Sequence, residues 1–379
     1  MKILILNQPP KLVLGAGALE ILITSLKKSH LRRLFVLADP FVAAKLKSIF
    51  SPFVDIDVKI EITTGGEPSF DDFNRVVAIA RKHKTDAVIG VGGGSVLDLA
   101  KLVASLMDAK EPVQSFVGDG IIKERSIPLI CIPTTSGAGS ESSPNAILID
   151  PTDNSKKGII SSVLMPDAVY IEPDLLSSLP SDITAYTGLD ALTHCIEAYA
   201  NVNAHPVVDL YALEGIRLIS QNLGRAIADG KDLEARTYVA LGAYYGGLCL
   251  GPVNTAAVHA LAYPLGTNFK IPHGLSNALL LPFVLEFNLD YALDRYASIG
   301  MAMGGDLSLH KKAAAKQGID LIKKFIENCG MTANLSGLGV SIDDIPKMAR
   351  EALLIQRLLK NNVREVKLQD AISIYQNAL

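Results

Sequence analysis

The stretch DAVIGVGGGSVLDLAK, residues 86–101, decides the fold that we expect for the first half of the chain. It consists of a short apolar run, three glycines and the start of an amphipathic helix, which is the order found in parallel sheets crossed by helices. Glycines let a backbone approach a phosphate closely, and the N–H groups of a helix N-terminus favour an anion. The stretch predicts a phosphate-binding turn at Gly93, Gly94 and Ser95. It lacks the common GxGxxG pattern, so a plain tight turn is the alternative.

The same alternation of strand and helix extends outward from this stretch. Apolar runs predict strands at residues 33–39, 57–62, 86–93, 128–134 and 168–173, and amphipathic patterns predict helices at residues 70–84 and 95–107. After about residue 180 strand-like runs nearly vanish and long helical patterns continue to the C-terminus. We therefore expect an α/β dinucleotide-binding domain with a parallel sheet over residues 1–180 and an all-helical metal-binding domain over residues 181–379. Ser181 or Asp182 can cap the first helix of the second domain.

Composition limits the classes of protein that the chain can belong to. Its 379 residues, 49% hydrophobic, suffice for two domains with sizeable cores, and its net charge of −3 argues against binding to nucleic acid. No apolar run of about 18 residues predicts a membrane span, and the N-terminus is not a convincing signal peptide. The cysteines show no CxxC spacing and read as reduced thiols of a cytoplasmic protein. They are Cys131, Cys195, Cys249 and Cys329.

Two further segments follow predicted strands and suit a nucleotide. Asp39 ends the strand at residues 33–39, where a carboxylate can accept from both ribose hydroxyls and repel a 2′-phosphate, so it favours NAD over NADP. A helix cap before Pro40 is the alternative. Thr134 and Thr135 begin a hydroxyl-rich loop, residues 134–145, and can donate to a phosphate or to the nicotinamide amide; an ordinary surface loop is the alternative.

Histidines and one aspartate in the second half suit a metal ion. In GLDALTHCIEAY, residues 188–199, Asp190 and His194 stand four apart and so share one face of a helix. His259 and His273 lie at the two ends of HALAYPLGTNFKIPH. A packed histidine and a loop histidine are the simpler interpretation of that pair alone. Together, three histidines and one aspartate predict a site for a first-row divalent ion such as Fe(II) or Zn(II).

These motifs, in this order and over essentially the whole chain, resemble the iron-containing (group III) alcohol dehydrogenase family. The resemblance implies a two-domain fold akin to dehydroquinate synthase and hydride transfer between a primary alcohol and NAD. It implies iron, with zinc as the other possibility, bound by Asp190, His194, His259 and His273. It also implies contacts with the cofactor from Asp39, Gly93, Gly94, Ser95, Asp98, Thr134, Thr135, Asn145 and Lys156.

The chain departs from the family pattern in two places. Tyr263 stands where many members have a second histidine, in an HxxxH pattern linked to proton relay, and a phenol is a weaker acid–base group near neutral pH. Ser69 replaces the asparagine of a GxxPN segment. Both departures, and RLLKNN at residues 357–362, resemble a subset that includes 4-hydroxybutyrate dehydrogenases, which implies an omega-hydroxy acid as one candidate substrate. Its carboxylate could pair with a C-terminal cation, although surface charges are the simpler interpretation of Arg357, Lys360 and Arg364.

Other activities remain open at this point. The same fold supports maleylacetate reduction and hydroxyacid–oxoacid transhydrogenation with a tightly held cofactor. A non-enzymatic nucleotide-binding scaffold fits less well, because it would bury aspartate and histidine side chains without compensation. We expect a small alcohol or aldehyde as substrate, neither nucleic acid nor membrane as a partner, and a homodimer, since two-fold symmetry is the commonest arrangement of oligomers.

Overall fold

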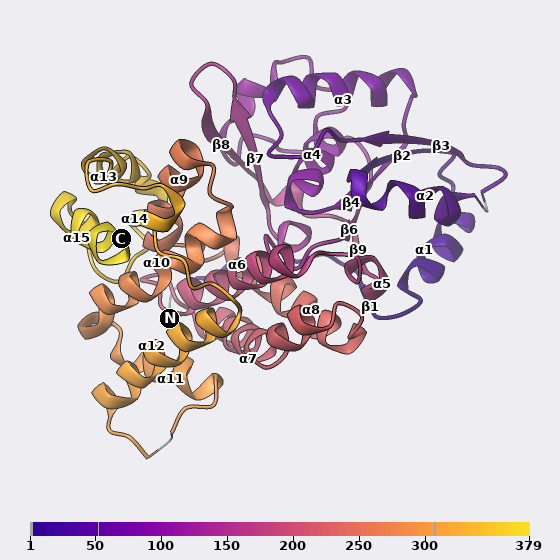
Figure 1. The fold of residues 1–379 in the computed structure, drawn as a ribbon. Coiled ribbons are helices and arrows are strands. Elements are labelled where there is room, and N and C mark those ends of the chain that lie inside the picture. The colour runs from indigo at the N-terminus through magenta and orange to yellow at the C-terminus, as the bar shows by residue number, and fades with distance from the viewer. Residues whose placement is uncertain (1–2, 52, 307) are drawn as a thin grey trace. The chain divides into compact units, whose positions relative to one another are not determined.

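The structure, a computed structural model, describes residues 3–51, 53–306 and 308–379 (Figure 1). The described residues form two compact units, one spanning Leu6–Ser178 and the other Leu179–Leu379 together with residues 3–5. The sequence places residues 3–5 with the α/β part, whereas Leu4 packs against the core of the helical unit. The independence of the two predicted domains, with a boundary at residue 180, stays a prediction.

The first unit is built on a sheet of parallel strands, as predicted. Its strands lie in the order β1 (Leu12–Leu14), β9 (Ala168–Ile171), β6 (Leu129–Pro133), β4 (Ala87–Gly92), β2 (Arg33–Ala38) and β3 (Asp57–Ile62). Every predicted strand appears within a residue or two of its expected bounds. The sequence does not predict β1, because three residues are too few to show a period.

Helices cover both faces of this sheet. Along β4, Ile89 and Val91 face the cluster formed with α1 (Ala18–Lys27) and α2 (Ala43–Phe50). Gly90 faces the other way, where an added Cβ would lie 2.8 Å from Cβ of Ala100 on α4 (Gly94–Ser105). The helix that follows β2 and the helix that follows β4 therefore lie on opposite faces of the sheet. Open α/β sheets bind ligands at the carboxyl ends of strands where the direction of winding reverses in this way.

A second, smaller sheet was not predicted. It contains β5 (Gly118–Asp119), β8 (Ser155–Ile160) and β7 (Asn145–Asp150), and β7 pairs with β8 in antiparallel register. The turn between them ends at Asn154, whose φ of 57° is left-handed. The other α-helices of this unit are α3 (Phe70–Lys82) and the short α5 (Pro173–Leu176).

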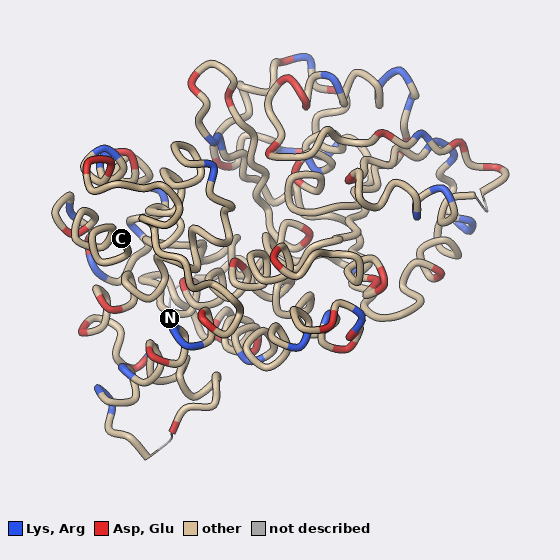
Figure 2. The backbone as a smooth tube through the Cα atoms, viewed as in Figure 1, with Lys and Arg blue, Asp and Glu red and all other residues tan. Residues whose placement is uncertain are grey.

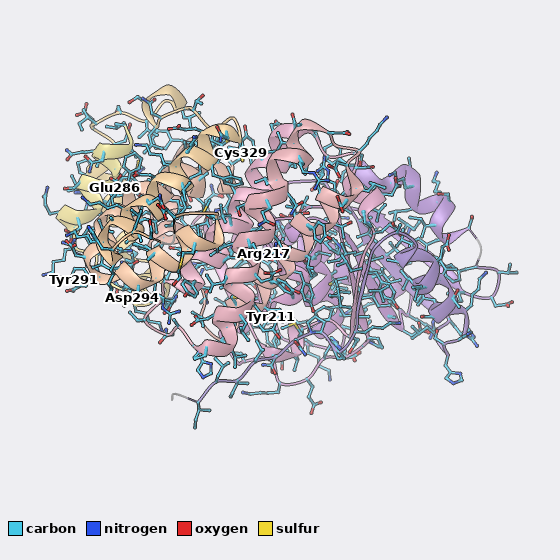
Figure 3. The ribbon with its side chains drawn as sticks, turned by 90° about the horizontal axis from the view of Figure 1, so that it is seen from below. Tyr211, Arg217, Glu286, Tyr291, Asp294 and Cys329 are labelled. Carbon is cyan, nitrogen blue, oxygen red and sulfur yellow. The ribbon has the colours of Figure 1, made fainter. Side chains whose placement is uncertain are left out.

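The second unit is helical, as predicted. Its helices are α6 (Ser181–Tyr199), α7 (Pro206–Ala228), α8 (Leu233–Leu250), α9 (Ala257–Phe269), α10 (His273–Asn288), α11 (Leu293–Ala302), α12 (Lys311–Asn328), α13 (Ile345–Leu353), α14 (Gln356–Leu359) and α15 (Leu368–Ala378). Figure 3 shows α7 with its side chains Tyr211 and Arg217. The predicted cap of α6 is wrong: Pro180 precedes the helix, and no side chain caps it, because Ser181 is already helical.

Small residues let these helices pack closely. A Cβ on Gly188 of α6 would lie 2.3 Å from a methyl carbon of Leu223 on α7, and one on Gly215 of α7 would lie 2.5 Å from Cys195 Sγ on α6. All four cysteines are free and buried. Acidic and basic residues are interspersed along the traces of both units (Figure 2). Among the described residues, no helix combines the length and the apolar character that crossing a bilayer requires.

Candidate metal centre and nucleotide site

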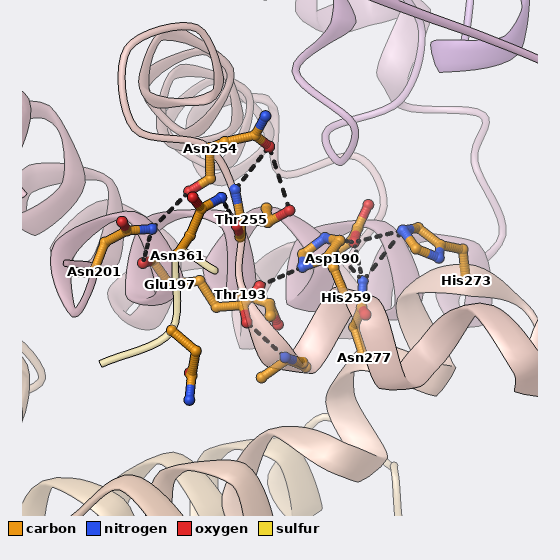
Figure 4. A network of polar contacts seen from close by, with 12 residues as sticks. Asp190, Thr193, Glu197, Asn201, Asn254, Thr255, His259, His273, Asn277 and Asn361 are labelled. Carbon is orange, nitrogen blue, oxygen red and sulfur yellow. Dashed lines mark hydrogen bonds and ion pairs between the residues drawn. The ribbon is translucent and has the colours of Figure 1, made fainter. Parts of the chain in front are cut away.

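Three helices of the second unit bring together Asp190, His259 and His273 (Figure 4). One ligand atom from each residue lies within 4.8 Å of the ligand atoms of the other two. Asp190 lies on a buried face of α6, His259 stands in the first turn of α9, and His273 is the first residue of α10. Carboxylate oxygen and imidazole nitrogen are the donors that divalent first-row metals take in proteins.

Gly274 lets the start of α10 reach α6. A Cβ at this position would lie 2.0 Å from the carbonyl oxygen of Tyr186 and 3.2 Å from Cβ of Asp190. No side chain other than hydrogen fits there, because real Cβ atoms stay beyond about 3 Å from such an oxygen. The glycine after His273 thus sets the distance between His273 and Asp190.

The amide of Asn277 lies at the centre of the three donors. Its Nδ2 is 2.7 Å from Asp190 Oδ1, 3.1 Å from His259 Nε2 and 3.3 Å from His273 Nε2. The Nδ2 group donates to Asp190 Oδ1, and both ring nitrogens lie within 3.3 Å of it, so the three ligand atoms already surround one positively polarised group. The arrangement of Asp190, His259 and His273 therefore fits a metal cation.

Glu197 directs the ring of His259. Its Oε1 accepts from the backbone N–H of Val258 at 2.6 Å, and its Oε2 lies 2.6 Å from His259 Nδ1. Because a carboxylate only accepts, a hydrogen lies on Nδ1, so Nε2, on the side of Asp190, is the nitrogen available to a metal. Glu197 was not predicted, although it lies two turns after Asp190 on the same helix and is only 4% exposed.

Electrostatics at this site favour a bound cation. Burial lowers the pKa of His259, but its hydrogen bonds to Asp190 and Glu197 outweigh burial and raise the pKa to about 10. Burial raises the pKa of Asp190, but His194, His273 and His259 outweigh it and hold the pKa well below its usual range. Asp190 and Glu197 together therefore form an anionic pocket that holds a positive charge, and a metal ion would displace the proton of His259.

His194 and Tyr263 flank the three donors. The ring of His194 stacks on that of His259, with centroids 4.7 Å apart, and His194 is not one of the three converging donors. Its role as a fourth ligand stays a prediction. The ring of Tyr263 lies 5.8 Å from that of His273, and its hydroxyl accepts a hydrogen bond from Arg357.

In the first unit, the predicted nucleotide segments meet at one edge of the sheet. The N–H of Asp39 donates to Val91 O at 3.0 Å, and the N–H of Thr134 donates to Gly92 O at 3.0 Å, so three strand ends lie side by side. The helix α4 begins at Gly94 with no side-chain cap, which leaves its first N–H groups suited to an anion. A Cβ on Gly94 would lie 2.7 Å from Cβ of Ala138, because the hydroxyl-rich loop packs against this turn.

The other predicted cofactor residues have mixed surroundings. Asp39 accepts from Phe41 N at 2.8 Å and so caps a short helical turn, which is the alternative interpretation of this residue. Asp98 is engaged inside the protein: its carboxylate accepts from the Ser140 hydroxyl and from Ile147 N, and it lies 3.6 Å from buried Lys101.

The remaining predicted residues of this group lie near the same loop or on the hairpin. Gly93 caps α4, and a Cβ there would lie 3.3 Å from Thr135; Ser95 stands in the first turn of the helix. Oδ1 of Asn145 is buried and has no hydrogen-bond partner among the described residues, so it fits a ligand donor. Lys156 pairs with Glu67. The contacts of all these residues with a nucleotide stay predictions.

The departure at Ser69 has a structural reason. Its hydroxyl accepts from Asp72 N, and the Asp72 carboxylate accepts in return from Ser69 N, which forms a capping box at the start of α3.

Comparison with known proteins gives matches along the whole chain. The family described as "Iron-containing alcohol dehydrogenase" matches residues 9–173, and "Fe-containing alcohol dehydrogenase family, C-terminal" matches residues 184–379. A long-chain-alcohol dehydrogenase of Geobacillus thermodenitrificans is 36% identical over 98% of this chain and 95% of its own. An NAD-dependent methanol dehydrogenase of Bacillus methanolicus is 29% identical over 98% of both chains. The crystal structure of a 1,3-propanediol oxidoreductase superposes with a TM-score of 0.95 and 28% identity over 100% of both chains.

Proposed function

The chain belongs to the iron-containing alcohol dehydrogenase family, and from that premise we propose that it transfers a hydride between a primary alcohol or its aldehyde and NAD. The observation that supports this proposal most directly is the convergence of Asp190, His259 and His273 on one point. We propose that these three residues and His194 hold Fe(II), with Zn(II) as the other candidate.

A divalent ion bound there supplies Lewis acidity, which lowers the pKa of an alcohol hydroxyl and polarises an aldehyde. The chain's own residues prepare the site for it. Glu197 fixes the orientation of His259, and Gly274 sets the separation of His273 from Asp190. Tyr263, one helical turn beyond His259, is the proposed group for moving the proton of the alcohol toward solvent.

For the nucleotide we propose the carboxyl edge of the parallel sheet. The N-terminus of α4 with Gly93 and Gly94 suits the pyrophosphate, and Asp39 at the end of β2 suits the ribose hydroxyls of NAD. The buried Oδ1 of Asn145 suits a donor such as the nicotinamide amide. We further propose a homodimer in the cytoplasm, since four free thiols suit a reducing compartment and two-fold dimers are common.

The proposal is tested by anaerobic reduction of butyraldehyde and lactaldehyde with NADH, using enzyme reloaded with Fe(II). Asp190→Ala and His273→Ala should each abolish turnover and retention of the metal together, because each removes a converging donor. His30→Ala is the matched control, since His30 is an exposed histidine of the other unit.

Loss of turnover with full metal retention in both variants would refute the ligand assignment. Exchange of hydride between a hydroxy acid and an oxo acid, without net consumption of NADH, would replace the proposed dehydrogenase by a transhydrogenase.

A further inference from the structure

One C-terminal cation lies beside the candidate metal centre. Nη2 of Arg357 on α14 donates to the hydroxyl of Tyr263 at 3.0 Å, and its Cζ is 6.0 Å from the centroid of that ring. The Tyr263 ring in turn lies 5.8 Å from the ring of His273. A single aromatic ring therefore separates the guanidinium of Arg357 from a converging donor of the metal site.

Buried amides hold the segment that carries Arg357 in place. Asn361 donates to the carbonyl of Thr255, just before α9, at 2.8 Å. Asn362 and Asn288, at the end of α10, exchange a reciprocal pair of amide hydrogen bonds at 2.8 and 2.9 Å. The first anchor immediately precedes the helix that supplies His259, and the second is the last residue of the helix that supplies His273. The position of Arg357 relative to the metal centre is thus fixed by the same framework as the ligands themselves.

The guanidinium of Arg357 keeps donors for a ligand. It carries five N–H groups, and its one hydrogen bond to a described residue is that to Tyr263. No carboxylate among the described residues lies within ion-pair distance of Arg357, and its side chain is exposed. A planar fork with open donors and an unneutralised charge matches the geometry of a carboxylate.

Neither of the two other basic residues of this segment combines open donors with a place beside Tyr263. Arg364 donates to Phe287 O at 2.8 Å, and its Cζ stacks 3.9 Å from the centroid of the Phe287 ring, so its role is structural. Lys360 is exposed and makes no side-chain hydrogen bond to a described residue. Of the three candidate cations, only Arg357 stands next to Tyr263.

We propose that Arg357 binds the carboxylate of a substrate whose alcohol or aldehyde carbon lies a few carbons away, so that the enzyme selects omega-hydroxy acids and the corresponding oxo acids. Tyr263 positions Arg357 by accepting a hydrogen bond from one of its N–H groups, which leaves the other N–H groups of the guanidinium for the substrate. This inference rests on the proposed dehydrogenase function and adds the class of substrate to it.

The test compares two four-carbon aldehydes, succinic semialdehyde and butyraldehyde, which differ in the terminal carboxylate. With NADH and Fe(II)-loaded enzyme, we expect Arg357→Gln to raise KM for succinic semialdehyde about tenfold with little change in kcat, since an exposed charge-assisted contact is weaker than a buried one. KM for butyraldehyde should stay within about twofold. Lys360→Gln removes the same charge from the same segment and should change neither KM by more than about twofold.

Two further readouts separate recognition from a general charge effect. Added NaCl should raise KM for succinic semialdehyde in the wild type and have less effect in Arg357→Gln, because salt screens an exposed ion pair. Arg357→Lys keeps the charge but loses the fork, so its KM should fall between those of the wild type and Arg357→Gln. A circular dichroism spectrum and a urea unfolding midpoint like those of the wild type show that each variant is folded.

The outcomes separate the proposed role of Arg357 from the proposed dehydrogenase function. If the wild type reduces butyraldehyde and Arg357→Gln alters KM for both aldehydes equally, or for neither, the carboxylate assignment is overturned while the dehydrogenase function stands. If the wild type reduces neither aldehyde, nor lactaldehyde, the proposed function fails and this inference fails with it.

Discussion

Replacing Glu197 by Gln tests the metal site without changing any proposed ligand. Both carboxylate oxygens are in use, one accepting from Val258 N and the other from His259 Nδ1, each at 2.6 Å. A glutamine amide offers one acceptor and one donor in those two positions. Either the glutamine N–H₂ faces the N–H of Val258, donor to donor, or it donates to His259 Nδ1 and shifts the ring hydrogen to Nε2, the nitrogen that would bind a metal; Glu197 is only 4% exposed, so water cannot relieve either change.

The size of the effect follows from that geometry. Groups that orient a ligating histidine change metal affinity by about 10- to 100-fold when they are replaced, so we expect a loss of that order for Glu197→Gln. The metal-free protein should also lose about 3 kcal/mol of unfolding free energy, because breaking one side of a buried charged pair leaves the other side uncompensated.

The assay is competition for Zn(II) or Fe(II) against a chromophoric chelator, with urea unfolding of the metal-free protein measured in parallel. Glu214→Gln is the matched control, since Glu214 forms a surface ion pair with Arg217 and its side chain is 41% exposed. The control should change metal affinity by less than about twofold. Equal metal affinity in the two variants would refute the view that Glu197 orients His259 toward a metal.

Three more outcomes are expected. Gly274→Ala should lower kcat about 100-fold and weaken metal retention, because its Cβ would meet Tyr186 O at 2.0 Å and push the start of α10 away from α6. Gly224→Ala on α7, whose Cβ meets nothing within 4 Å, should keep full activity; equal activity of the two alanine variants would contradict the packing argument. Burial raises the pKa of Glu141 from 4.5 to about 7, so the folded protein favours the neutral carboxyl. The stability that this preference contributes is fully present below pH 4.5 and is lost as pH rises through 7. Glu141→Gln should therefore gain up to about 3 kcal/mol of unfolding free energy over the wild type at pH 8 and none at pH 4, as measured by urea unfolding; parallel pH curves would exclude this linkage. Asp39→Gly should raise the ratio of kcat/KM for NADPH to that for NADH and cost only about 0.3 kcal/mol of stability, because glycine is well tolerated at a cap; an unchanged cofactor ratio would leave Asp39 as a cap only.

The parts of the site that lie within one short segment could be predicted from the sequence. The strand, glycine run and helix at residues 86–101 are local, and the spacing of Asp190 and His194 by itself puts both on one face of α6. That spacing does not show which of the two side chains reaches the point where the metal ligands converge. In the structure Asp190 is one of the converging donors, whereas His194 stacks on His259 beside them.

The pairing of β7 with β8 shows a second limit. Residues 134–145 predict a hydroxyl-rich loop, and the strand that begins at Asn145 has too short an alternating pattern to stand out from it. Its partner β8 begins with a serine and two lysines, a polar pattern that does not indicate a strand. The segment is a strand because it pairs with β7 in the hairpin.

By itself, the sequence determined the alternation of strands and helices, the change to a helical second half and the identities of the candidate metal donors, because each of these depends on residues a few positions apart. Only the tertiary structure decided which groups support them. Glu197 meets His259 across 62 positions, Asn277 meets Asp190 across 87, and Arg357 meets Tyr263 across 94. No local period encodes such contacts, since they arise only when separate helices pack against one another.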